Sequence, residues 1–321
     1  MTDHGEDAPD LSILMVSWNT REMTLAAIRS VYAETRDTRF EVILVDNGSA
    51  DGTVDAVRAA FPQVRLLAER ENHGFAKGNN IAARAATGRL LLLLNTDTLV
   101  RDRAIDRLMA FAAARPEARI WGGRTLFGDG RLNPSSAWNR ITAWSAFCLA
   151  VGLTTLNPRS PRLNPEQVAL WGDGQERAVD IVSGCFFLVE RSLWEQLDGF
   201  DTTFFMYGEE ADFCGRARRA GARPRVTPEA EIVHFGGGSA VRPTNTLVYL
   251  FGARIGLALR HLPPASARIA RAMTIFQAWW RALLYGLAAR LSPGRRDAAS
   301  QWREMWRRRA EWRDGPVRAA L

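Results

Sequence analysis

The chain has 321 residues, 47% of them hydrophobic, which suffices for a large globular domain with an additional segment and argues against an intrinsically disordered protein. Its net charge of +7 is unevenly distributed, because residues 241–321 contain 15 arginines and four acidic residues while the remainder carries a net −4. The cysteines, Cys148, Cys185 and Cys214, are odd in number and form no C-x-x-C pair, which argues against a disulfide framework and a zinc knuckle.

The first ten residues are acidic and polar, whereas a secretory signal begins with basic residues and continues with an apolar run. We therefore expect residues 1–10 to form a short disordered leader. Because no export signal is recognisable, we expect a cytoplasmic location. A reducing compartment also suits cysteines that have no evident pairing.

Short apolar runs alternate with helical patterns in the first hundred residues. Leu11–Val16 and Phe40–Val45 are typical of buried parallel strands, and Thr24–Glu34 between them carries apolar residues at helical spacing, so this segment predicts a βαβ unit. The pattern continues with a helix, a strand, a second helix and a second strand, over Thr53–Ala60, Val64–Leu67, Asn79–Ala86 and Arg89–Leu94. This alternation predicts a doubly wound α/β sheet.

Polar segments follow each of these strands, with the sequences SWN, DNGS, ENHG and NTD. Ligands of doubly wound sheets bind beyond the carboxyl ends of the strands, so the four segments predict a binding site, although the same residue types also dominate ordinary turns. Asp46 could accept the imide N–H of a uracil or thymine ring, or could cap a turn. Neither G-x-G-x-x-G nor G-x-x-x-x-G-K-[ST] is present, which argues against dehydrogenases and P-loop enzymes.

Two residues are candidate metal ligands. Asp97 follows the strand LLLLL, where a hard divalent cation could bind its carboxylate and the phosphate oxygens of a nucleotide diphosphate and neutralise the leaving group. His234 stands between a short apolar run and the glycines of HFGGGS. A single histidine is more often structural than a ligand, but one at this position could reach a metal or a phosphate.

Three carboxylates, Glu209, Glu210 and Asp212, lie within four residues directly after the aromatic run Phe204–Tyr207. A carboxylate that is partly desolvated among aromatic side chains has a raised pKa, which suits a general base that deprotonates an acceptor hydroxyl. The alternative is the acidic first turn of a solvated helix. We favour the catalytic interpretation.

Together these motifs resemble the family 2 glycosyltransferases of the GT-A fold, and in particular their bacterial rhamnosyltransferase-like members. The resemblance covers about residues 11–239 and rests on SWN, VDNGSADGT, ENHGFAKGNN, LLNTD, SGCFFLVER, GFD, MYGEEADFC and VHFGGGS. It implies a Rossmann-like GT-A domain, a mixed sheet flanked by helices, over residues 11–240, with a nucleotide-binding half at about 11–100 and an acceptor half at about 101–240. Residues 241–321 would form a C-terminal helical extension.

The resemblance also implies roles for individual residues. Asp46 would contact the pyrimidine, Asn72 and the following glycines would line the nucleotide pocket, and Asp97 and His234 would bind a divalent cation, Mg²⁺ or Mn²⁺. The residues expected at the nucleotide are Ser17, Asn19, Asp46, Asn47, Asn72, Gly74, Asn79 and Asn95.

The sequence departs from the family pattern at two places. The acidic pair after the aromatic run is usually Glu-Asp with the aspartate as base, but here that position is Glu210, so Glu210, Glu209 and Asp212 all remain candidates. The metal motif begins with Asn95 in place of an acid, so cation binding depends largely on Asp97. The implied mechanism is one in-line displacement at the anomeric carbon, with inversion.

Two segments combine aromatic and apolar residues outside the strand pattern. Residues 141–158 contain no charged residue. This segment predicts either a buried core helix or a contact with a membrane interface or acceptor lipid. Residues 241–321 mix tryptophan with arginine, which suits an anionic membrane surface. A helical hairpin packed on the catalytic domain, or a homodimer interface, would also explain this composition, and no motif supports nucleic-acid binding.

The sequence thus predicts an inverting, metal-dependent hexosyltransferase that moves rhamnose or a related hexose from a dTDP- or UDP-sugar to a glycan or polyprenyl-linked acceptor in cell-surface polysaccharide synthesis. It would be peripheral on the inner face of the cytoplasmic membrane. The alternative is a non-catalytic, membrane-associated scaffold or sugar-nucleotide-binding protein with the same fold. Retention of Asp97, the acidic cluster and His234 favours the enzyme.

Overall fold

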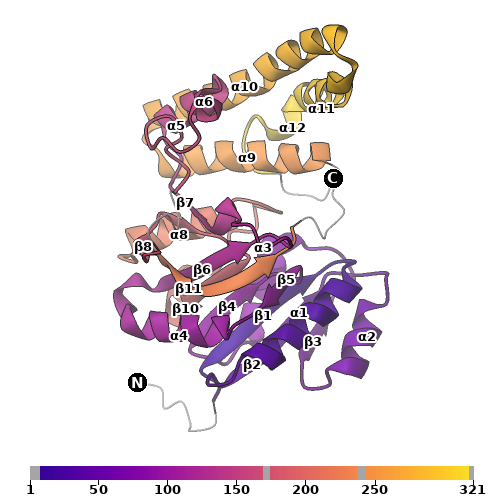
Figure 1. The fold of residues 1–321 in the computed structure, drawn as a ribbon, viewed down its shortest axis with the longest axis vertical. Helices are drawn as coiled ribbons and strands as arrows, with labels where there is room; N and C mark the ends of the chain where they lie inside the picture. The colour runs from indigo at the N-terminus through magenta and orange to yellow at the C-terminus, as the bar shows by residue number, and fades with distance from the viewer. Residues whose placement is uncertain (1–7, 169–173, 237–242, 318–321) are drawn as a thin grey trace. The chain divides into compact units, whose positions relative to one another are not determined.

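The structure is a computed structural model that describes residues 8–168, 174–236 and 243–317 (Figure 1). Most of the expected leader, residues 1–7, lies outside this part of the chain. Contacts divide the chain into two units. Unit 1 contains Met1–Trp138, Leu170–Asp201 and Phe213–Ser239, and unit 2 contains Asn139–Ala169, Thr202–Asp212 and Ala240–Leu321.

Unit 1 is built on a nine-stranded sheet in the order β3-β2-β1-β4-β10-β6-β11-β5, with β8 paired to β11. Its strands are β1 (Leu11–Ser17), β2 (Phe40–Asp46), β3 (Arg65–Ala68), β4 (Leu90–Leu94), β5 (Thr98–Val100), β6 (Ile120–Leu126), β8 (Arg177–Ala178), β10 (Phe186–Glu190) and β11 (Arg225–His234). The first four strands in this order are parallel, and β10 then pairs antiparallel with both β4 and β6. A separate pair joins β7 (Ala137–Trp138) to β9 (Ile181–Val182).

Helices cover both faces of this sheet (Figure 1). The helices that follow strands in unit 1 are α1 (Arg21–Glu34), α2 (Thr53–Ala60), α3 (Gly74–Ala85), α4 (Ala104–Ala114) and α7 (Arg191–Gln196). Alternate strand side chains such as Ile13 and Met15 pack with α1, α2 and α4 in one core cluster, whereas α3 packs on β1 and β2 outside that cluster. Because successive side chains of a strand point to opposite faces, both faces of the central strands are buried.

The expected fold class, a mixed α/β sheet flanked by helices with a C-terminal helical extension, is confirmed. Helix α2 has the predicted bounds, and β1, β2 and β4 differ from prediction by one residue at one end. The predicted start of α3 at Asn79 was wrong, since the helix begins at Gly74. There Asn72 Oδ1 accepts the Gly74 N–H at 2.9 Å, and Gly74 adopts φ +78°, which glycine tolerates, so the chain enters the helix earlier than its apolar spacing indicates.

Unit 2 consists of helices in the described part of the chain. They are α5 (Ala143–Ala150), α6 (Leu153–Leu156), α9 (Pro243–His261), α10 (Pro264–Leu291), α11 (Arg296–Arg307) and α12 (Arg309–Trp312). One core cluster joins α9 to α10, α11 and α12 through residues such as Phe251, Ala278 and Trp312. Helix α8 (Glu209–Arg219) begins in unit 2 and continues into unit 1.

The apolar segment at residues 141–158 forms the short helices α5 and α6. Helix α5 packs on α10, with Ala146 buried in a cluster with Ala258 and Ala270, while Trp144 and Phe147 remain 50% and 37% exposed. The segment therefore forms two short helices of unit 2, the first of which is partly buried. None of the helices in the described ranges has both the length and the apolar composition that a membrane span requires.

A buried ion pair joins α9 to the segment that follows α6 in unit 2. Arg254 donates to both carboxylate oxygens of Glu166, at 2.6 and 2.7 Å, and each side chain is 21% exposed. Burial alone would raise the pKa of Glu166, but the charge and hydrogen bonds of Arg254 lower it below its ordinary value. The pair is thus present as ions at neutral pH.

Removing one partner of this pair should destabilise the protein. We expect Glu166→Ala to lower the free energy of unfolding by about 2–3 kcal/mol, less than the roughly 3–5 kcal/mol of a fully buried pair because a fifth of each side chain is exposed. Because the folded-state pKa is lowered, the pair stabilises above the unfolded-state pKa, and this stabilisation should disappear as the pH falls through the folded value. Urea unfolding at pH 7 and at acid pH measures both effects.

The matched control is Glu304→Ala, which removes an exposed partner 3.9 Å from Arg308 and should change stability by less than about 0.5 kcal/mol. Equal effects of the two substitutions would contradict a stabilising role for the buried pair.

Candidate active site

The loops after β1 and β2 are tied together at the carboxyl edge of the sheet. The Asn47 N–H donates to the Ser17 carbonyl at 2.8 Å, and the Asn19 N–H donates to Ser49 Oγ at 2.9 Å. Asn19 Oδ1 in turn accepts the Ala50 N–H at 2.8 Å. These bonds fix the two loops relative to each other before any ligand arrives.

Asp46 ends β2 and has one carboxylate oxygen without a partner. The residue is 1% exposed, and its Oδ1 accepts the Ser49 N–H at 2.9 Å. Asp46 Oδ2 and the neighbouring Asn47 Oδ1 are buried and have no hydrogen-bond partner among the residues that the structure describes. A buried acceptor without a donor is costly, so these oxygens fit a ligand that brings N–H or O–H groups.

Several other predicted nucleotide-site residues use their side chains within the fold. Asn79 Nδ2 donates to the Phe75 carbonyl at 2.9 Å inside α3, and Asn47 Nδ2 donates to the Gly74 carbonyl at 3.1 Å. The Ser17 hydroxyl is fully buried and bonds to Thr24 Oγ1 at 2.9 Å. These contacts position α3 and the strand ends, and the contribution of these side chains to nucleotide binding stays a prediction.

Strand pairing brings Asp97 and His234 together. The short strand β5 pairs antiparallel with the end of β11, so that His234 lies opposite Thr98, and the Phe235 N–H donates to the Asp97 carbonyl at 3.0 Å. His234 Nε2 lies 3.2 Å from Asp97 Oδ1 and 3.5 Å from Asn95 Nδ2. Residues 137 positions apart in the chain thus form one polar group at the sheet edge.

The group formed by Asn95, Asp97 and His234 has the chemistry of a divalent-cation site. It offers a carboxylate, an imidazole nitrogen and the buried Asn95 Oδ1, which accepts no hydrogen bond from the described residues. Within the described ranges, no three His, Cys, Asp or Glu side chains converge as a metal-binding group, so ligand phosphates would have to complete the coordination. The residues fit a cation that is shared with a diphosphate.

Electrostatics link His234 to its neighbours. Burial would lower its pKa, but Cys185 and the Asp97 carboxylate raise the pKa of His234 to about 10. In the absence of a cation the imidazole is therefore protonated and forms an ion pair with Asp97. A cation at Nε2 has to replace that proton, as it does at histidine ligands generally.

The three predicted catalytic carboxylates lie in the first turn of α8, within unit 2, and differ in their surroundings. Asp212 Oδ1 lies 2.9 Å from His261 Nε2 and 3.6 Å from Arg260 Nη1, so this carboxylate is paired. Glu209 and Glu210 each have a buried Oε2 that makes no hydrogen bond to the described part of the chain. Burial and the Glu210 carboxylate raise the pKa of Glu209 well above its usual value, and burial also raises the pKa of Glu210.

Sequence reasoning missed Arg260 and His261, which end α9. Besides Asp212, Arg260 contacts Thr203 Oγ1 at 2.7 Å and lies over the Phe204 ring at 5.0 Å. The two residues thus fix the segment before α8 and its first turn. Nothing in their spacing signals this role, because the contacts join positions about 50 residues apart.

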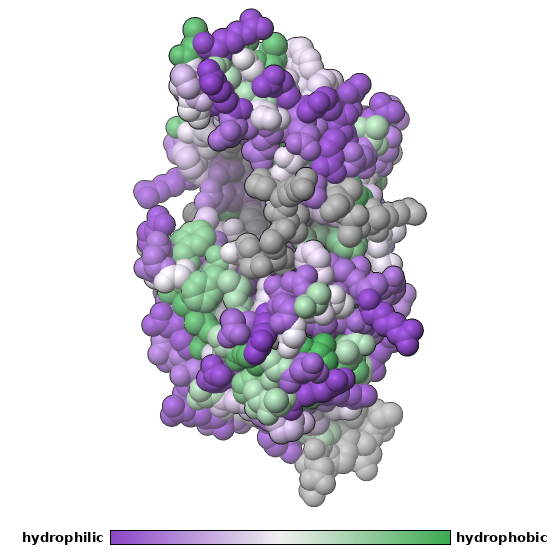
Figure 2. Space-filling view, turned by 90° about the vertical axis from the view of Figure 1, so that its right-hand side faces the viewer, coloured by the Kyte–Doolittle hydropathy of each residue, from purple (hydrophilic) through white to green (hydrophobic). Residues whose placement is uncertain are grey.

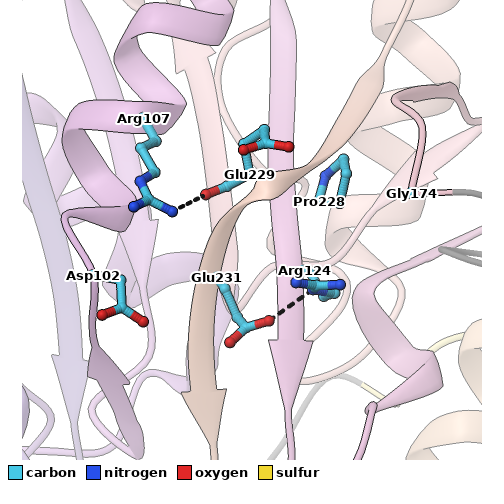
Figure 3. A pocket seen from close by; sticks show the side chains of 7 residues that line it. All are labelled: Asp102, Arg107, Arg124, Gly174, Pro228, Glu229 and Glu231. Carbon is cyan, nitrogen blue, oxygen red and sulfur yellow. Dashed lines mark hydrogen bonds and ion pairs between the residues drawn. The ribbon is translucent and has the colours of Figure 1, made fainter.

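A hollow of about 280 Å³ in unit 1 lies among other residues (Figure 3). It is lined by Asp102, Arg107, Arg124, Gly174, Pro228, Glu229 and Glu231. Figure 3 shows Arg124 paired with Glu231, at 2.7 Å, and Arg107 donating to the Glu229 carbonyl, at 3.2 Å. None of the predicted site residues lines this hollow.

Comparisons with known proteins concern the fold and the family of the chain. The mannosyltransferase PcManGT from Pyrobaculum calidifontis, solved in complex with GDP-Man and Mn2+, superposes with a TM-score of 0.55 at 18% identity, over 94% of this chain and 86% of that one, which shows the GT-A fold. The N-acetylglucosaminyl-diphospho-decaprenol L-rhamnosyltransferase of Mycobacterium tuberculosis is 30% identical over 60% of this chain and 66% of its own length. The Escherichia coli rhamnosyltransferase WbbL is 25% identical over 51% of this chain and 61% of its own.

The chain thus spans slightly less than two thirds of the length of these two curated relatives. The family profile described as glycosyl transferase family 2 matches residues 12–197, which include the ends of β1, β2 and β4 and the Asp97 loop. This match covers more than half of the chain. The protein therefore belongs to glycosyl transferase family 2.

Proposed function

We propose that the protein is a metal-dependent, inverting glycosyltransferase that uses a dTDP- or UDP-sugar, with rhamnose or a related hexose as the sugar. The observation that carries the proposal is the unpartnered, buried Asp46 Oδ2 on the same sheet edge as the Asp97–His234 pair. Asp46 suits the pyrimidine base of the nucleotide, and the Asp97–His234 pair suits the diphosphate. Rhamnose is favoured because two relatives are named as rhamnosyltransferases.

Donor binding would use the tied loops of unit 1. Asp46 Oδ2 would accept the imide N–H of the pyrimidine, a donor that uracil and thymine carry and that satisfies this buried oxygen. Asn95, Asp97 and His234 would hold Mg²⁺ or Mn²⁺ against the diphosphate. The cation would supply charge neutralisation of the departing nucleotide diphosphate.

Acceptor activation would use the first turn of α8. A glutamate with a raised pKa and an oxygen free of hydrogen bonds can take the proton of an acceptor hydroxyl as that oxygen attacks the anomeric carbon. The attack forms the new C–O bond while the bond to the nucleotide diphosphate breaks, which inverts the anomeric configuration. Asp212 would position this turn through His261.

The acceptor would be a glycan or a polyprenyl-linked sugar in cell-surface polysaccharide synthesis. The support is the name of the Mycobacterium relative, a transferase to N-acetylglucosaminyl-diphospho-decaprenol. Such an acceptor is held in a membrane, so the enzyme would work at the inner face of the cytoplasmic membrane, with residues 241–321 as its contact.

Calorimetric titration of dTDP, UDP and GDP in the presence of Mn²⁺ tests the donor site. We expect wild type to bind a pyrimidine diphosphate more tightly than GDP, and Asp46→Ala to weaken that binding about 10–100-fold, since a hydrogen bond to a charged group contributes about 1.5–3 kcal/mol. Asp55→Ala, at an exposed position on α2, serves as the control and should bind as wild type does. Equal affinity of wild type and Asp46→Ala would refute the assigned base contact, and failure of every nucleotide to bind would refute the proposed function.

A further inference from the structure

One face of α10 exposes large apolar side chains. Ile269, Trp279, Trp280, Leu283, Leu284, Leu287 and Leu291 are 37–90% exposed. At 100° per residue these positions fall within an arc of about 140° around the helix, so they form one continuous stripe, the apolar face of α10.

The opposite side of α10 packs inside unit 2 through small and polar residues. Ala270, Thr274, Ala278 and Ala282 are between 0% and 9% exposed and lie away from the stripe. Helices of water-soluble domains bury their large apolar side chains and expose polar ones. Helix α10 packs Met273, Ile275 and Tyr285 partly into unit 2 but leaves the stripe of large apolar side chains exposed, which marks its apolar face as a surface for an apolar partner.

Arginines border this face at the turn between α10 and α11. A groove of about 620 Å³ there is lined by Leu283 and Leu287 of the apolar face and by Arg290, Arg296 and Arg303. All three arginines are exposed, and in the described part of the chain none of them has a carboxylate within ion-pair distance. Asp297 is the acidic residue that lines the groove. Figure 2 views the molecule from the side of this turn, and most of the residues on the surface of the helices in this view are hydrophilic.

We propose that the apolar face of α10 and these three arginines dock on the surface of an anionic phospholipid bilayer. Tryptophan and leucine side chains would enter the boundary between headgroups and acyl chains, and the arginines would bind headgroup phosphates. Helix α10 would lie in the plane of the interface, because it lacks the apolar composition of a membrane span. This deepens the membrane contact of the proposed function and specifies its residues.

Charge decides between a bilayer and a second copy of the chain. A twofold dimer through this face would bring the same patch of both copies together, and with it two sets of unpaired arginines. An anionic bilayer instead supplies the phosphates that the arginines lack within the protein.

Co-sedimentation of the full chain with vesicles tests the proposal. We expect binding to phosphatidylcholine vesicles that contain about 30% phosphatidylglycerol, with weaker binding at high salt and little binding to phosphatidylcholine alone. The triple variant Arg290→Gln, Arg296→Gln, Arg303→Gln should partition about a hundredfold less, from the loss of three basic side chains near an anionic surface. Leu283→Ser with Leu287→Ser should also weaken binding, and both positions are 43–50% exposed, so the fold should tolerate the change.

The matched control replaces three exposed arginines of unit 1, Arg29, Arg36 and Arg89, with glutamine and should bind vesicles as wild type does. Wild type that binds nucleotide but stays in solution with anionic vesicles would overturn the proposal while leaving the proposed activity intact. A wild-type dimer in solution that the leucine substitutions dissociate, without any change in vesicle binding, would also overturn it. Equal losses in the control and the groove variant would mean that net charge, and not this surface, governs binding.

Discussion

Replacing Asp97 with asparagine is expected to remove the Mn²⁺-dependent part of nucleotide diphosphate binding and to lower the transfer rate by about a thousandfold or more. Asparagine keeps the size of the side chain but loses the charge that a hard cation requires, and charge stabilisation by a bound metal contributes several kcal/mol to such a reaction. The His234 imidazolium would also lose its ion-pair partner at 3.2 Å. Titration of the nucleotide with and without Mn²⁺, together with initial transfer rates, measures both effects.

The control for this substitution is Asp102→Asn. Asp102 lies in the turn after β5, is 62% exposed and pairs with Arg101 at 3.1 Å, and its positive φ of 47° is one that asparagine also adopts. It should leave nucleotide binding and rate unchanged. Unchanged Mn²⁺ dependence in Asp97→Asn would show that the cation does not bind at this carboxylate.

The part of the site that could be predicted from sequence is the part that local patterns determine. The runs that became β1, β2 and β4 are rich in apolar residues and are followed by polar ones, so Asp46 and Asp97 could be placed at a common sheet edge without a structure. The assignment of α2 needed only its apolar spacing and the glycine-rich turn before it.

The rest depended on contacts between distant parts of the chain. Strand β5 has three residues, too few to show a periodicity, yet its pairing with β11 is what carries His234 to Asp97. The antiparallel pairing of β10 with β4 joins residues such as Phe186 and Leu94, which are more than 90 positions apart, and no local pattern encodes it. Likewise, the sequence left Asp212 equivalent to its two glutamate neighbours, and only the tertiary contact with His261 distinguishes it.

Glu209 and Glu210, the two carboxylates that do not pair with His261, differ in their surroundings, and this difference indicates which is the general base. Burial and the Glu210 charge raise the pKa of Glu209 well above the usual value, and burial also raises the pKa of Glu210, so one proton shared by the pair is favoured over two charged carboxylates. Glu209 is 4% exposed whereas Glu210 is only partly buried, so Glu210 is the more accessible of the two to an acceptor. We therefore infer that Glu210 is the base, with a protonated Glu209 beside it.

Matched glutamine substitutions separate the two glutamates. We expect Glu210→Gln to lower kcat about 10²–10⁴-fold, the usual contribution of a general base, with donor affinity unchanged. Glu209→Gln resembles the protonated form of Glu209, so it should retain most of the activity. In wild type, kcat/KM should fall on the acid side through a pKa above the ordinary glutamate value, because burial raises the pKa of Glu210 and the base works only when ionised. If Glu209→Gln is the inactive variant and Glu210→Gln the active one, the two roles are exchanged; if both retain full activity, neither glutamate is the base.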